Sequence, residues 1–181
     1  MVRRIALVLM GLGIAVIGVI GGGQIIEAEE SKQAASAPPP APPAMTKEEL
    51  QAFLARPLIA RLATVRPNHS PQIVPMWFLY EDGVMYMSTR TSAAKVKHLQ
   101  KNPRVAVVVD VMEAPRKNKV VTIEGTAEVL TTGVKETTTK IYHKYLGTEG
   151  AATPAAQQSI NTPRVILKIT PKKIESLDTT H

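Results

Sequence analysis

The sequence predicts a mainly β domain, built as a six- to seven-stranded antiparallel barrel with a few small helices. Short segments with strand-like alternation of apolar and polar residues follow one another at close spacing. Most of them are separated by turns rich in Gly, Pro, Asn and Asp, and the helical patterns between them are short. A doubly wound parallel sheet would need a long crossover between successive strands, so we expect hairpin-connected strands that close, or nearly close, into a barrel.

A helix and a three-stranded meander begin the domain. The segment Thr46-Lys-Glu-Glu49 has the pattern of a capping box, which predicts a helix that begins after Thr46 and ends before Pro57. Turn-forming residues at 66–70 and 81–83 separate the alternating segments that follow. The strands expected there span 58–65, 72–80 and 84–89.

The rest of the domain contains two more helices and further strands. Gly125 lies in the middle of an alternating strand, a position typical of a bend or bulge in a barrel. The expected elements are, in chain order, a helix at 93–101 capped by Ser92, a strand at 104–112, a polar loop at 113–118, a strand at 119–130, a helix at about 133–146, a loop at 147–162, and a strand at 164–170 that 173–177 prolongs.

Residues 1–44 differ from the rest of the chain and form two predicted segments. Residues 5–23 are an uninterrupted apolar run behind Arg3 and Arg4, and at ~1.5 Å rise per residue a helix there would span roughly 28 Å, about the thickness of a bilayer core. We therefore interpret 1–23 as a membrane anchor or signal segment, with the domain at 45–181 outside the cytoplasm. Residues 24–44 are Ala/Pro-rich and predict an extended linker.

Three interpretations of this N-terminal region stay open. An uncleaved anchor needs only the apolar run, whereas a cleaved signal peptide would use a small-residue site such as 35–37. In the third interpretation Met45 is the true start, and the domain is then cytoplasmic.

Composition narrows the classes of function. Acidic and basic side chains cancel within residues 1–44, so the formal net charge of +7 belongs to residues 45–181. The chain has no cysteine, which excludes disulfides, thiolate nucleophiles and cysteine-ligated metals. The histidines are scattered and no Gly-x-Ser-x-Gly occurs, so we predict neither a metal site nor a catalytic side chain. The aromatic residues fall mainly on strands rather than among the clustered lysines, so nucleic acid is not expected as a partner.

One segment carries the residue types of a phosphate site. Ser88, Thr89 and Arg90 end a predicted strand, and Lys95 lies in the first turn of the helix that follows. Hydroxyl donors, free N–H groups at a helix start and positive charges together suit a phosphate group. A solvated turn with ordinary capping contains the same residue types, so both interpretations stay open.

A second segment, at 72–78, has the residue types of a ring-binding surface. Pro75 lies inside a predicted strand, where it signals an edge, a bulge or a gap in the ladder. Met76 and Trp77, the only tryptophan of the chain, supply a flat apolar surface. Trp77 as a simple core residue accounts for the pattern equally well.

Several segments occur in a fixed order along the domain, and the order and spacing resemble the flavin-binding split-barrel superfamily, also called the pyridoxamine-phosphate-oxidase-like family. The segments are Arg61-Leu-Ala-Thr-Val65, Ser70-Pro-Gln-Ile-Val-Pro-Met-Trp77, Tyr86-Met-Ser-Thr-Arg-Thr-Ser-Ala-Ala-Lys95, Asn102-Pro-Arg-Val-Ala106 and Ile123-Glu-Gly-Thr-Ala127. The resemblance implies a split β-barrel that forms a homodimer, with a flavin in a cleft between the subunits. The residues that it carries over by position are Lys95 at the cofactor phosphate, with Ser88, Thr89 and Arg90 nearby, and Val74, Pro75, Met76 and Trp77 along the ring.

The resemblance also implies a function. It implies an oxidoreductase that transfers a hydride between a bound flavin or deazaflavin, FMN or coenzyme F-420, and a small organic substrate. The chain ends at 172–181 without the Arg/His-bearing substrate segment of true pyridoxamine-phosphate oxidases, so oxidation of that vitamin is not expected. Two alternatives stay open: a non-catalytic flavin-binding or electron-carrier module tethered to a membrane, and a basic nucleic-acid-binding barrel.

Overall fold

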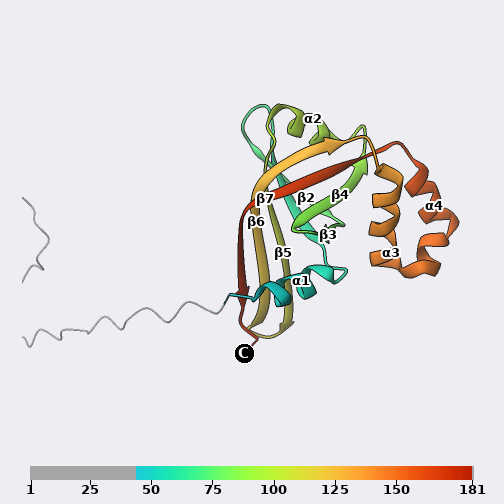
Figure 1. Cartoon of the computed structure of the whole chain (residues 1–181). Coiled ribbons are helices and arrows are strands. Elements are labelled where there is room, and N and C mark those ends of the chain that lie inside the picture. The colour runs from blue at the N-terminus through green and yellow to red at the C-terminus, as the bar shows by residue number, and fades with distance from the viewer. Residues whose placement is uncertain (1–43, 181) are drawn as a thin grey trace, which may run out of the picture. The chain divides into compact units, whose positions relative to one another are not determined.

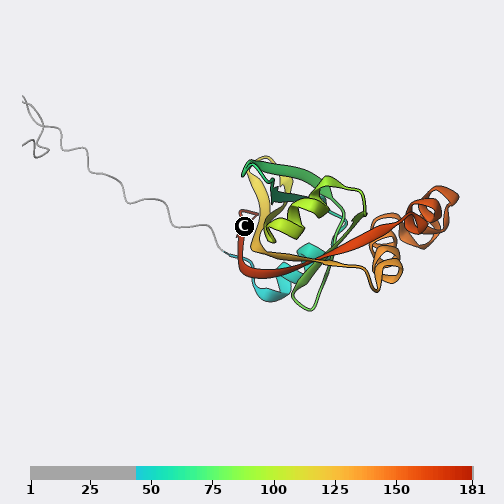
Figure 2. The same cartoon turned by 90° about the horizontal axis from the view of Figure 1, so that it is seen from above.

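The computed structural model describes residues 44–180 of the chain (Figure 1). The predicted membrane or signal segment at 1–23 and the predicted linker up to residue 43 lie outside these described residues. Within 44–180, no helix combines the length and the apolar content needed to cross a bilayer. Seen from above, the helices drawn in orange and red-orange lie to one side of the strands (Figure 2).

Four helices and seven strands make up residues 44–180. In chain order they are α1 (Lys47–Ala55), β1 (Ala60–Val65), β2 (Pro71–Met76), β3 (Leu79–Glu81), β4 (Val84–Arg90), α2 (Ala94–Lys101), β5 (Arg104–Ala114), β6 (Lys117–Leu130), α3 (Val134–Ala152), α4 (Pro154–Asn161) and β7 (Arg164–Asp178). The predicted capping box at the start of α1 is confirmed. The hydroxyl of Thr46 accepts from the Glu49 N–H at 3.2 Å, and the Glu49 carboxylate accepts from the Thr46 N–H at 2.8 Å.

The seven strands form one sheet in the order β2-β1-β5-β6-β7-β4-β3, and every neighbouring pair is antiparallel. Its two edge strands, β2 and β3, are joined only by Trp77 and Phe78. The sheet must therefore curl until its edges approach each other, which produces a barrel (Figure 1). The predicted fold class, mainly β with six to seven antiparallel strands and small helices, is confirmed.

The barrel bends where β6 and β7 pair. β6 pairs with β5 only up to Thr126, and β7 pairs with β4 only through 164–169, so the two long strands pass from one half of the sheet to the other. The pairing register shifts between Glu124 and Gly125 at this crossing. Glycine is required because a Cβ there would lie 2.3 Å from the carbonyl oxygen of Thr170. The predicted bend or bulge at Gly125 is confirmed.

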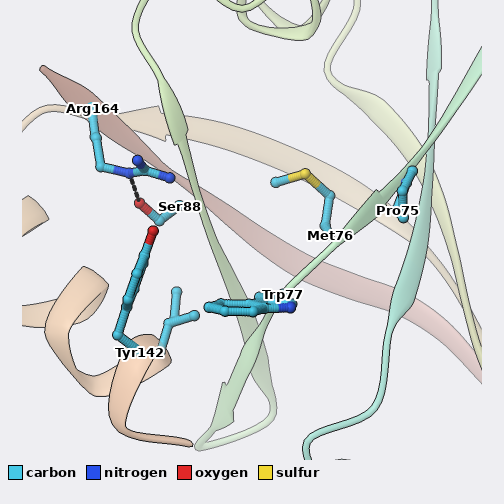
Figure 3. Close-up of a pocket in the computed structure, with 7 residues that line it drawn as sticks. Pro75, Met76, Trp77, Ser88, Tyr142 and Arg164 are labelled. Carbon is cyan, nitrogen blue, oxygen red and sulfur yellow. Dashed lines mark hydrogen bonds between the residues drawn. The ribbon is translucent and has the colours of Figure 1, made fainter. Parts of the chain in front are cut away.

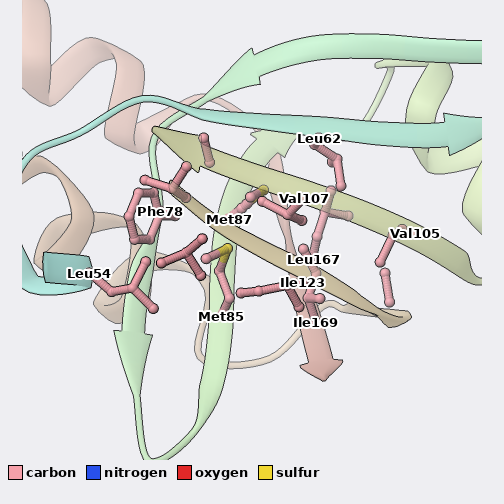
Figure 4. Packing of buried hydrophobic residues seen from close by; sticks show 14 of the residues in the cluster. Leu54, Leu62, Phe78, Met85, Met87, Val105, Val107, Ile123, Leu167 and Ile169 are labelled. Atoms are coloured by element: carbon pink, nitrogen blue, oxygen red, sulfur yellow. The ribbon is translucent and has the colours of Figure 1, made fainter. Parts of the chain in front are cut away.

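Apolar side chains from most strands meet inside the barrel (Figure 4). Strand alternation selects them: in β4, Met85 and Met87 are buried, whereas Tyr86 and Ser88 are only partly covered. α3 packs against β3, β4 and β7. Ser88 therefore points away from the core.

Two predicted strand boundaries are wrong because strand pairing decides them. The strand expected at 72–80 is two strands, since Met76 pairs with Ala60 on β1 whereas Leu79 pairs with Tyr86 on β4. The loop expected at 113–118 is mostly strand, because β5 and β6 continue into a tight hairpin around Arg116, whose φ is +65°.

Two helix predictions are also wrong. Ser92 does not cap α2; the cap position is Ala93, because the Ala93 N–H donates to the Arg90 carbonyl in a turn that contains Ser92. The loop expected at 147–162 is helical, since α3 continues past a kink at Gly147 and α4 follows it. Burial of apolar side chains such as Ile160, which is 4% exposed, stabilises this helical pair.

Candidate functional site

A cavity of about 260 Å³ opens where the end of β2, β4, the start of β7 and α3 meet (Figure 3). Its lining residues are Pro75, Met76, Trp77, Ser88, Ile141, Tyr142 and Arg164. The first four are sequence-predicted site residues, and the last three are not. The cavity therefore unites most of the predicted ring-binding segment with one residue of the predicted phosphate segment.

Aromatic side chains of α3 hold Trp77 in place. The Trp77 ring stacks on Tyr145 with centroids 4.6 Å apart and planes 6° apart, and it meets Tyr142 edge-to-face at 5.3 Å. The Tyr145 hydroxyl donates to the Leu58 carbonyl and accepts from the Phe78 N–H at 3.2 Å. Burial raises the pKa of Tyr145 to about 12, so this hydroxyl stays protonated at neutral pH. Trp77 is thus a fixed wall of the cavity with one face of its ring already covered.

Lys144 lies next to Tyr145, with its ammonium 5.5 Å from the centroid of the Tyr145 ring. Its ammonium donates to the Leu54 carbonyl at 2.8 Å and lies 3.6 Å from the centroid of the Phe78 ring. Burial lowers the pKa of Lys144 to about 8. The carbonyl and the ring face both stabilise the charged form and oppose the effect of burial. Lys144 therefore connects α3 to the end of α1 without lining the cavity.

The polar end of the cavity is built around Arg164. Its Nε donates to the Ser88 hydroxyl at 2.8 Å (Figure 3). Its Nη1 donates to the Ser159 carbonyl at 3.1 Å. The Ser88 hydroxyl also lies 2.8 Å from that of Thr138, and the Tyr142 hydroxyl lies 2.5 Å from that of Ser159. This network gives the cavity a hydroxyl-rich wall with one positive charge.

The other predicted phosphate residues lie apart from the cavity. Successive residues of a strand point to opposite faces, so Thr89 is buried on the side away from Ser88. Lys95 donates to the Thr89 hydroxyl at 3.3 Å, and burial lowers the pKa of Lys95. Arg90 is exposed and lies opposite Arg164 in the ladder between β4 and β7. The predicted phosphate set is thus divided between the cavity and the start of α2.

Val74 is the one predicted ring residue that does not line the cavity. It is half-buried and packs against the barrel core. Among the residues that sequence reasoning missed, Tyr142 and Tyr145 are three positions apart in the predicted helix, a spacing that places both on one face. Arg164 had no such signal, because its place depends on the pairing of β7 with β4.

Comparison with protein families finds a match to the family described as pyridoxamine 5'-phosphate oxidase, over residues 46–178. Comparison with curated proteins finds no match.

Three solved structures illustrate the similarity of fold. A conserved hypothetical protein from Mycobacterium tuberculosis is 24% identical, with a TM-score of 0.66, over 75% of this chain and 86% of its own. An F-420 reductase is 28% identical, with a TM-score of 0.56, over 68% of this chain and 94% of its own. A FAD-binding protein from Mesorhizobium loti is 22% identical, with a TM-score of 0.54, over 74% of this chain and 93% of its own.

Proposed function

We propose that this chain, which belongs to the pyridoxamine 5'-phosphate oxidase family, is an oxidoreductase dependent on FMN or coenzyme F-420. It transfers a hydride between this cofactor and a small organic substrate. The observation that carries the proposal is the cavity, where the apolar surface of Pro75, Met76 and Trp77 adjoins a polar end at Ser88. The 28% identity to an F-420 reductase supports the deazaflavin as one of the two cofactors.

The residues present fit a planar ring with an anionic tail. Residues 75–77 offer the ring an apolar surface, while Lys95 and Arg90 are cations that no ion pair within residues 44–180 neutralises. When bound, the cofactor supplies the hydride chemistry of its ring. The chain's own residues orient it: 75–77 exclude water from the ring, Ser88 lies at the polar end of the same cavity, and Lys95, which contacts Thr89 at the start of α2, holds the phosphate.

A second copy of the chain completes the site in this proposal. The cavity of about 260 Å³ is smaller than the roughly 300–1,000 Å³ of complete ligand pockets. Ile73, 67% exposed, lies in register with Ala63 of β1, which lies in register with Ala106 of β5, so the outer face of the sheet carries an apolar strip. Pro75, two residues further along β2, lies on the same face and lines the cavity. A copy docked on this strip therefore reaches the cavity.

Sedimentation of the purified chain tests the dimer. We expect a dimer, and we expect Ile73→Lys to convert it to a monomer because the lysine would have to lose its hydration in the interface. Leu146→Lys is the matched control, since Leu146 is also an exposed apolar residue, 42% exposed, but lies on α3. A monomeric unsubstituted chain would contradict the dimer proposal.

The cofactor is tested on the full-length chain. Its absorption spectrum and the mass of any retained small molecule should identify FMN or coenzyme F-420. Adding either cofactor should raise the Tm, with ligand-linked stabilisation of ~2.7 kcal/mol at a hundredfold excess over Kd. Riboflavin, which lacks the phosphate, is the matched control and should stabilise less. If neither cofactor changes the Tm, the proposed function is wrong.

We also propose that residues 1–23 anchor the chain in a membrane or direct its export. The apolar run behind Arg3 and Arg4 supports this. Cell fractionation combined with the mass of the mature chain separates the cases. An intact chain in the membrane fraction indicates an anchor, and a chain shortened near 35–37 indicates a cleaved signal. A chain that begins at Met45 and stays in the cytoplasm contradicts the proposal.

A further inference from the structure

Arg164 is the one charged side chain that lines the described cavity, and none of the proposed cofactor contacts uses it. Its Nε and Nη1 donate to neutral acceptors, the Ser88 hydroxyl at 2.8 Å and the Ser159 carbonyl and hydroxyl at 3.1 and 3.3 Å. These bonds fix the guanidinium plane. Within residues 44–180, its remaining nitrogen, Nη2, has no acceptor. The arginine is therefore held in position with donor capacity left over.

The charge of Arg164 is not balanced by any acidic side chain of the described residues. None of the ion pairs within residues 44–180 includes Arg164. Its directly opposed neighbour on β4 is Arg90, and like charges opposite each other destabilise a sheet. An anion in the cavity would accept from Nη2 and reduce this repulsion.

The walls of the cavity indicate the kind of anion. Tyr142 and Ile141 line the cavity together with Arg164, beside the surface of residues 75–77 proposed for the cofactor ring, so the space next to the ring suits a small apolar or aromatic body. One guanidinium balances one negative charge, and the two N–H groups of Nη2 can donate to a carboxylate. We propose, building on the proposed function, that Arg164 binds the carboxylate of a small aromatic or apolar acid, which is the substrate class of this oxidoreductase.

Calorimetric titration of the full-length chain with benzoate and with its neutral isostere benzamide tests this assignment. Benzoate should bind about tenfold to a hundredfold more tightly, which is the effect of hydrogen bonds to a charged group. In Arg164→Gln, the affinity for benzoate should fall to that for benzamide, whereas the affinity for benzamide should not change. Arg104→Gln is the matched control, because Arg104 also begins a strand but is exposed, and it should keep the full preference. Quenching of Trp77, the only tryptophan, should accompany benzoate binding and locate it in this cavity.

Equal affinities for benzoate and benzamide in the unsubstituted chain would overturn the inference, and so would a preference that survives in Arg164→Gln. If Arg164→Gln does not fold, Arg164→Lys keeps the charge but not the bonds to Ser88 and Ser159 that fix the guanidinium, and it should lower the preference severalfold. An unchanged preference there also overturns the inference.

Titration with FMN separates the two proposals. A preference for benzoate that depends on Arg164, in a chain that binds no FMN or coenzyme F-420, supports the carboxylate site and contradicts the proposed cofactor. If Arg164→Gln instead loses FMN affinity and the unsubstituted chain shows no preference for benzoate, Arg164 belongs to the cofactor phosphate and the inference is overturned.

Discussion

Substituting Gly125 with alanine tests the crossing of β6 and β7, on which both halves of the barrel depend. The added Cβ would lie 2.3 Å from the Thr170 carbonyl oxygen, 3.1 Å from its carbon and 3.2 Å from the Cα of Pro171. All three are backbone atoms, so no side chain can rotate away. Real Cβ atoms essentially never approach closer than 3.0 Å, so the two strands must separate locally by at least about 0.7 Å.

The expected loss of stability follows from that separation. Overpacking of this kind destabilises by about 1–3 kcal/mol, and weakening the ladder hydrogen bonds on either side adds roughly 1 kcal/mol each. We therefore expect Gly125→Ala to lower the free energy of unfolding by about 3 kcal/mol or more, out of a total of roughly 5–15 kcal/mol for a domain.

Urea unfolding followed by circular dichroism measures this change. Gly133→Ala is the matched control: Gly133 has a φ of +64° and nothing within 4 Å of the added Cβ. Its backbone strain alone should lower stability by about 1–2 kcal/mol. A Gly125→Ala protein that is as stable as Gly133→Ala would refute the argument, because it would mean that β6 and β7 are not in close contact at this point.

Three further substitutions test the site and its supports. Lys95→Ala should raise the Kd for FMN about tenfold or more, as expected for a lost charged hydrogen bond. Lys97→Ala, on the exposed side of α2, is the control and should leave the Kd unchanged. If the two variants have equal Kd values, Lys95 does not bind the phosphate. Tyr145→Phe removes a hydroxyl with two backbone partners, and it should lower the free energy of unfolding by roughly 2 kcal/mol in urea titrations. A change smaller than the error of the method would contradict the hydrogen bonds assigned to this hydroxyl. Burial lowers the pKa of Lys144 to about 8, so between that pH and its unfolded pKa of about 10.4 the unfolded chain binds more protons and stability rises with pH. The rise in stability should be about 1–2 kcal/mol after allowing for solvent screening. When the Tm is compared between pH 7 and pH 10, the rise should be present in the unsubstituted chain and absent in Lys144→Met. Parallel Tm curves for the two proteins would show that the pKa of Lys144 is not lowered.

Features of the fold that depend on residues close together in sequence were predicted with nearly correct bounds. The capping box at Thr46, the turn before Val84 and the alternation along β6 are of this kind. Gly125 was predicted as a bend because a glycine weakens the interior of a strand, since it has no side chain to pack, and such a glycine often marks a bulge or bend. The helical stretch after residue 146 was not predicted, since Gly147 and Gly150 have low helix propensity and only burial in the folded domain compensates for it.

The same distinction, between features set by residues close in sequence and features set by the fold, applies to the candidate site. Residue types and their spacing were enough to predict which groups are available: an apolar surface at 75–77, hydroxyls at the end of β4, and a lysine at the start of α2. Which of these groups lie together depends on how the strands and helices pack. Ser88 faces the cavity with Trp77, whereas Thr89, the next residue, faces the opposite side with Lys95.

The pairing of strands explains which of these groups lie together. Ser88 and Arg164 are 76 positions apart in sequence, and they share a hydrogen bond because β4 and β7 pair in one particular register. That register is selected by the burial of whole strand faces, and a shift of one residue would turn every side chain to the other side. Local residue preferences do not determine the pairing register, so the cavity and the position of Arg164 in it could not be predicted from the sequence.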